Sequence, residues 1–186
     1  VLKKEVEIAN VFEYTVMSDL AAYVATLSSG ILLPAITVEE RPERIPLSFS
    51  QERLWFLDEL QGTVAYHMPL VIRLEGGLNP TILEQSFKKV IARHEVLRTN
   101  ILSEGGAGYQ EVMDADAWSL VQEEISEDVL EEHLGIYLTN PFDLATDYKF
   151  RACLYNLGDE KYVLAAVIHH IASDGWSENI LINEFM

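Results

Sequence analysis

The chain has little cysteine, few basic residues and no long apolar run. Cys153 is the one cysteine among 186 residues, so an internal disulfide is impossible and a reducing compartment is expected. Thirteen Lys and Arg oppose 30 Asp and Glu, which gives a formal net charge of −17. This charge argues against nucleic acid and anionic membranes as partners, because both bind clustered Lys and Arg. Without a signal peptide or an apolar run near the ~18 residues of a membrane span, we expect a cytoplasmic protein.

An apolar segment that ends in two histidines is the most informative stretch of the sequence. Residues 163–168 hold no polar side chain and are rich in β-branched types, which predicts a strand buried on both faces. Adjacent strand residues point to opposite faces, so His169 and His170 cannot face the same cavity. Residues 173–175, Ser-Asp-Gly, then break the strand, and helical spacing follows over 176–186. Taken alone, this pattern also fits two core histidines at a strand–loop junction.

The preceding segments alternate between helical and strand patterns. Cap residues mark the helix starts: Ser48 or Ser50, then Asn79, then Ser126. Cys153 lies in an apolar alternation, where a core thiol is expected rather than a nucleophile. Spacing predicts helices over 46–60, 80–94 and 127–138, and strands over 66–74, 109–112, 148–156 and 162–170, the last two as a hairpin. The fold class expected from this order is α/β, a mixed sheet with helices packed on it.

Composition divides the chain into three parts. Residues 1–25 have a separate helical pattern, residues 26–45 combine Ser-Ser-Gly, two prolines and a charged run without a clean period, and residues 46–186 form the main domain. The middle part is typical of a linker. The chain begins at Val1 and ends at Met186 inside an expected helix, so we expect it to be cut from something longer.

Three motifs together resemble one known family. They are SFSQERLWFL at 48–57, RHEVLRT at 93–99 and HHIASDG at 169–175, and the segment NPFDL at 140–144 is similar to one that the family shares. In this order they resemble the condensation domains of nonribosomal peptide synthetases. Ser50 stands where the family usually has Ala, and Ile101 where Phe is commoner. The resemblance covers residues 45–186 and implies the N-terminal lobe of the two-layer chloramphenicol-acetyltransferase-like fold, without the second lobe. Residues 6–22 resemble the last helices of a peptidyl carrier protein.

The resemblance implies amide formation between two carrier-bound substrates, a thioester donor and an aminoacyl acceptor. It places the catalytic role on His170, whose imidazole would remove a proton from the attacking amine or orient it. Gly175 is expected to let the loop turn tightly and to present its N–H near the thioester oxyanion. No metal is expected, because His169 and His170 point apart and no Cys or carboxylate is spaced to complete a site.

Charged residues of the second motif are expected to support this loop. Asp174 is expected to be buried, in a structural ion pair with Arg98 or with an arginine outside this sequence. Arg93 belongs to the same supporting motif, and His94 is expected to be structural.

The resemblance also implies partners and leaves alternatives. Donor and acceptor peptidyl carrier domains, with their phosphopantetheine arms, and adjacent synthetase domains would be the partners, and no cofactor would bind the chain directly. The motif context is most similar to domains that join two L-residues, and this chain alone is expected to be inactive. The alternatives are a non-catalytic lobe that docks carriers and a coenzyme-A-dependent acyltransferase of the same superfamily.

Overall fold

The computed structural model describes residues 4, 6–27, 37–38, 40–62 and 64–185, and the chain divides into two compact units, residues 1–40 and 41–186. The first unit holds helices α1 (Ile8–Glu13) and α2 (Met17–Thr26). Lys4 Nζ donates to the carbonyls of Val24 and Ala25, at 2.8 and 2.9 Å, and so joins the segment before α1 to the last turn of α2. The division falls inside the expected linker, of which residues 28–36 and 39 lie outside the described residues. The carrier-domain origin of this unit stays a prediction.

The second unit is built on a four-stranded mixed sheet. Its strand order is β2 (His67–Glu75), β7 (Lys161–His169), β6 (Phe150–Gly158) and β5 (Val121–Glu124). β7 is antiparallel to both neighbours, whereas β5 is parallel to β6. The predicted hairpin of β6 and β7 is confirmed, and Gly158, Asp159 and Glu160 turn it with positive φ angles of 82°, 51° and 56°. β7 is therefore an inner strand, and its C-terminal end lies between β2 and β6.

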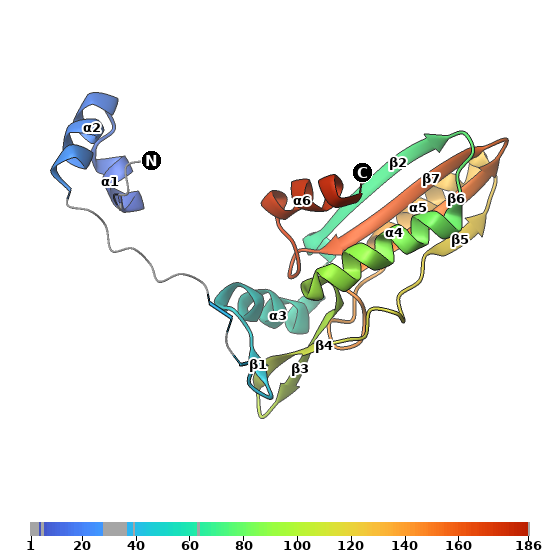
Figure 1. The fold of residues 1–186 in the computed structure, drawn as a ribbon, viewed down its shortest axis with the longest axis horizontal. Coiled ribbons are helices and arrows are strands. Elements are labelled where there is room, and N and C mark those ends of the chain that lie inside the picture. The colour runs from blue at the N-terminus through green and yellow to red at the C-terminus, as the bar shows by residue number, and fades with distance from the viewer. Residues whose placement is uncertain (1–3, 5, 28–36, 39, 63, 186) are drawn as a thin grey trace. The chain divides into compact units, whose positions relative to one another are not determined.

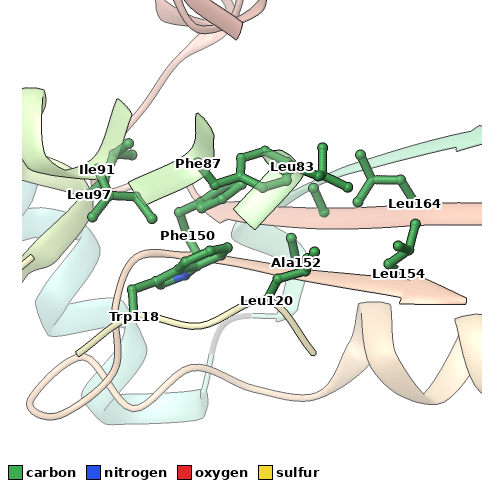
Figure 2. Close-up of a cluster of buried hydrophobic side chains, with 11 residues drawn as sticks. Leu83, Phe87, Ile91, Leu97, Trp118, Leu120, Phe150, Ala152, Leu154 and Leu164 are labelled. Atoms are coloured by element: carbon green, nitrogen blue, oxygen red, sulfur yellow. The ribbon is translucent and has the colours of Figure 1, made fainter. Parts of the chain in front are cut away.

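Helices cover both faces of this sheet (Figure 1). α4 (Pro80–Arg93) begins where Asn79 Oδ1 accepts the N–H groups of Thr81 and Ile82, with Pro80 at the first position, as the sequence predicts. Its buried stripe of Leu83, Phe87 and Ile91, four residues apart, packs against β6 and β7 (Figure 2). Burying three such side chains stabilises the fold by about 1.5–3 kcal/mol each.

The opposite face of the sheet packs on α5 (Leu130–Thr139), through Leu130 and the strand residues Cys153, Tyr155 and Val163. The core thiol expected at Cys153 is confirmed, and burial raises its pKa to about 11. The expected cap was wrong, because a short 3-10 helix, η3 (Glu127–Val129), separates Ser126 from α5.

The second unit also contains a smaller, antiparallel sheet. This sheet contains β1 (Ile45–Pro46), β4 (Ala107–Val112) and β3 (Thr99–Glu104), in that order. α3 (Phe49–Gln61) follows β1, and Ser48 caps it in a reciprocal pair of hydrogen bonds with Gln51. Gly108 lets α3 and the residue before its cap approach β4 closely, because a Cβ there would lie 3.2 Å from Trp55 Cε3 and 2.7 Å from Leu47 Cδ1.

The remaining elements connect these layers. η1 (Val64–Tyr66) leads into β2, η2 (Glu95–Arg98) joins α4 to β3, and α6 (Gly175–Phe185) follows β7. Leu181 of α6 packs against the core on the α4 side, whereas the neighbouring Ile180 is 46% exposed. Within the described residues, no helix combines the length and the apolarity that crossing a membrane requires.

Candidate functional site

The end of β7 separates the two histidines, as the alternation of a strand predicts. His169 is 1% exposed and faces the interior, whereas His170 is exposed. His169 is the last residue of β7 and lies opposite His67 of β2 in the ladder. The N–H of His170 donates to Tyr66 O at 2.9 Å, which holds the backbone beyond the strand end. Of the pair, only His170 is accessible to a substrate.

Hydrogen bonding fixes His169 as a neutral ring. Its Nδ1 accepts the N–H of Ile171 at 3.1 Å, so the ring proton is on Nε2 and a doubly protonated ring would lose this bond. Burial lowers the pKa of His169 to about 4, which agrees with that geometry. His169 therefore closes the turn after β7 and takes no proton near neutral pH.

A third histidine, His67, lies next to His169, and no sequence pattern predicts this position. The His67 ring is 6.1 Å from that of His169 and 5.1 Å from that of Phe142, between centroids. Its Nδ1 donates to Leu138 O at 3.0 Å, and burial lowers its pKa. Only the pairing of β2 with β7 brings His67 here.

Lys149 is a second residue that sequence reasoning missed. The side chain is 1% exposed, and its Nζ donates to Asn100 Oδ1 at 3.2 Å and to the carbonyl of Asp147. Its backbone carbonyl accepts the N–H of His169 at 2.9 Å, and its own N–H donates to Leu97 O at 2.8 Å. Burial lowers the pKa of Lys149 to about 8. Through these two backbone hydrogen bonds, Lys149 links Leu97 of the second motif to His169 of the third motif.

His170 borders a hollow of about 420 Å³. One wall is the start of α3, and the other is the loop after β7. The lining residues are Ser48, Ser50, Gln51, Leu54, His170, Ile171, Ala172, Ser173, Asp174 and Ser177. The fold therefore brings the first and third motifs, more than a hundred positions apart in the sequence, to one surface cavity. Among the described residues, no three His, Cys, Asp or Glu side chains gather as a metal site.

Asp174 corrects an expectation, because it is exposed rather than buried. Its Oδ1 accepts the N–H and the hydroxyl of Ser177, at 2.9 and 2.6 Å, so it acts as the cap of α6. The Ser177 hydroxyl and then its N–H lower the pKa of Asp174. Gly175 is the first residue of α6, without a positive φ, and a Cβ there would meet open space. The expected tight glycine turn is therefore wrong for this loop.

Arg98 does not pair with Asp174. Its Nε donates to Ile91 O at 3.3 Å, and its other nitrogens donate to the carbonyls of Met113 and Ala92. Arg98 thus caps the end of α4, whose last carbonyls have no partner within the helix. Of the two arginine partners considered for Asp174, the one inside this sequence is excluded by this geometry.

Arg93 and His94 reach the helix that follows the third motif. Arg93 Nε lies 3.3 Å from Glu184 Oε1, and His94 Nε2 donates to Glu184 Oε2 at 2.5 Å. His94 is therefore structural, as expected. Glu184 lies outside every motif recognised in the sequence, and only the fold identifies it.

The condensation-domain family model matches residues 42–186. A dimodular nonribosomal peptide synthase of Bacillus subtilis strain 168 is 40% identical over 180 residues, which are 95% of this chain and 8% of the relative. Cyclosporin synthetase simA of Tolypocladium inflatum is 37% identical over 187 residues, 98% of this chain and 1% of the relative. The chain thus spans less than a tenth of the length of these curated relatives.

Solved structures agree with the fold. The X-domain from teicoplanin biosynthesis is 32% identical with a TM-score of 0.74, over 82% of this chain and 33% of that one. The starter condensation domain of the rhizomide synthetase RzmA is 18% identical with a TM-score of 0.69, over 77% of this chain and 36% of that one. The fold is accordingly the mixed α/β, chloramphenicol-acetyltransferase-like fold, and the chain covers about a third of each solved relative.

Proposed function

This chain belongs to the condensation-domain family, and we propose that it supplies the histidine-bearing lobe of a domain that forms amide bonds in a nonribosomal peptide synthetase. In the proposed reaction, the α-amine of a carrier-bound acceptor attacks the thioester carbonyl of a carrier-bound donor. The C–N bond forms, the C–S bond breaks, and the thiolate of the donor arm leaves and takes up a proton. The amine loses a proton in the same process.

The observation that supports this most is the separation of the two histidines. His169 is buried and neutral, while His170 is exposed on a hollow that could admit a substrate arm. An imidazole can remove or guide a proton near neutral pH, which is what an attacking amine requires. We assign His170 to that task and His169 to holding the loop.

The partners in this proposal are donor and acceptor carrier domains and the neighbouring synthetase domains. Phosphopantetheine arms on the carriers would bring both substrates, so the chain itself would bind no resident cofactor. The end of the third motif and the two residues after it, Asp174-Gly-Trp-Ser177, favour the type that joins two L-residues. A cytoplasmic location fits this role.

The chain alone should be inactive. It spans about a third of the length of its solved relatives, and the hollow beside His170 is open to solvent. Effective positioning of two reactants supplies about 7–11 kcal/mol in well-oriented reactions, and a substrate held by this lobe alone loses most of it.

A reconstitution experiment separates this function from its alternatives. A domain extended to the length of the solved relatives is mixed with a donor-loaded and an acceptor-loaded carrier, and the amide product is measured by mass spectrometry. Product from carrier-bound donors, and none from the same acyl group on coenzyme A, is the expected result. Product from coenzyme A at an equal rate would favour the acyltransferase. Carrier binding without product would show a docking lobe.

A further inference from the structure

Two residues of the second motif hold the helix that follows the third. Arg93 ends α4 and His94 is its C-cap residue, and both contact the carboxylate of Glu184, one at each oxygen. α6 begins at Gly175, directly after the loop that carries His170. Glu184 lies nine residues further on, about 14 Å along a helix that rises 1.5 Å per residue.

Two further contacts of α6 lie at its first turn and near its middle. Leu181 packs on the core, and Asp174 caps the first turn. Trp176, Ile180 and Ile182 are 83%, 46% and 44% exposed, so much of the apolar surface of this helix contacts nothing in the described part of the chain. A core contact near the middle of a helix lets the helix rotate about that contact, and a second anchor near the far end limits the rotation.

The carboxylate of Glu184 is suited to be that anchor. Its side chain is 22% exposed and that of His94 is 27% exposed, so water screens their contact less than it screens a surface pair. The pair of Arg73 and Glu127, on the same unit, is 62% and 60% exposed. The two pairs therefore offer a natural comparison between a sheltered and a solvated contact.

We propose that Glu184, held by Arg93 and His94, is a positioning residue that sets the orientation of α6 and thereby the placement of the His170 loop. This inference rests on the proposed function, because the consequence of misplacement is a loss of condensation. Glu184 touches no substrate and acts through α6. A side chain misplaced by about 1 Å can lower a rate by about 10²-fold, so the effect on turnover can exceed the effect on stability.

The test measures kcat and KM for carrier-bound substrates in the extended domain. Glu184→Ala should lower kcat by about 10–100-fold with KM changed by less than about 3-fold, because orientation rather than binding is lost. Glu184→Gln keeps an oxygen that can accept from His94 and should recover most of the rate. Arg93→Ala added to Glu184→Ala should cost little further, since the two act as one unit. Glu127→Ala, which removes the solvated pair, is the matched control and should leave kcat unchanged.

Hydrogen exchange on the 186-residue chain provides the second measurement. The amides of residues 170–177 should exchange faster in Glu184→Ala than in the parent chain, while those of β6 and β7 keep their protection. Unchanged exchange in this loop, or a wild-type kcat in Glu184→Ala, would overturn the proposal. If the wild-type domain forms no amide but the loop still exchanges faster in the variant, the positioning role of Glu184 stands and the proposed function fails.

Discussion

Lys149→Met should remove a distinct part of the pH dependence of folding. Lys149 is 1% exposed, and burial lowers its pKa from 10.5 to about 8, against the opposing effect of Asp147, Asp143 and Asp58. Between these two pH values the unfolded chain keeps the proton and the folded chain gives it up. The contribution of Lys149 to the free energy of unfolding therefore rises with pH across this window and is constant, at its lower level, below it.

The size of the effect follows from that shift. The difference from 10.5 to about 8 is about 2.5 units, and one unit corresponds to about 1.36 kcal/mol, which gives about 3 kcal/mol. At pH 7 the methionine variant escapes this penalty but leaves Asn100 Oδ1 and the Asp147 carbonyl without their donor, at about 1–3 kcal/mol each. The two effects nearly cancel there. The pH profile, rather than the stability at neutral pH, is the informative quantity.

Urea unfolding followed by tryptophan fluorescence measures this profile, since Trp118 is buried against Phe150. From below pH 8 to about pH 10, the wild type should gain up to about 3 kcal/mol relative to Lys149→Met. Lys161→Met is the matched control, because Lys161 is exposed at the start of β7 and its profile should parallel that of the wild type. Parallel profiles for Lys149→Met as well would refute the conclusion that this ammonium is desolvated.

Two further substitutions test the loop around the site. His169→Ala should lower the free energy of unfolding by about 2–4 kcal/mol at pH 7 by urea denaturation, because a buried ring and the acceptor for Ile171 N–H are lost. Since the folded pKa of His169 is about 4, against 6.5 in the unfolded chain, the wild type should also lose stability as pH falls from 6.5 to 4, and a variant that loses it equally would contradict the neutral ring. Asp174→Ala should cost only about 1 kcal/mol, the usual value of a helix cap, whereas a loss of 3–5 kcal/mol would restore the buried ion pair that the structure excludes.

Local features of the fold could be predicted from the sequence because their causes lie within a few residues. Asn79 and Pro80 begin α4 through contacts that reach no further than Ile82. The opposite orientation of His169 and His170 follows from strand geometry alone. The same holds for the cap at Ser48 and for the hairpin of β6 and β7, whose partners are neighbours in the chain.

The misjudged features depend on pairings between distant segments. The family resemblance of the second motif made Arg98 a candidate partner of Asp174, yet in the fold Arg98 donates to carbonyls at the end of α4 and at Met113. His67 meets the motif only because β2 pairs with β7, a register that no local pattern specifies. Lys149 is buried although lysine is rarely found in protein interiors, so its residue type predicts an exposed side chain.

The central claim is that His170 acts on the reacting amine, and its removal tests this most directly. In the extended domain with loaded carriers, His170→Ala should lower the rate of amide formation by about 10²–10⁴-fold and leave the unfolding curve unchanged. His133→Ala is the matched control, since His133 lies on α5, contacts Glu123 of β5 and is outside the hollow, and its rate should equal that of the wild type. A wild-type rate in His170→Ala, with a range of acceptors, would contradict the account.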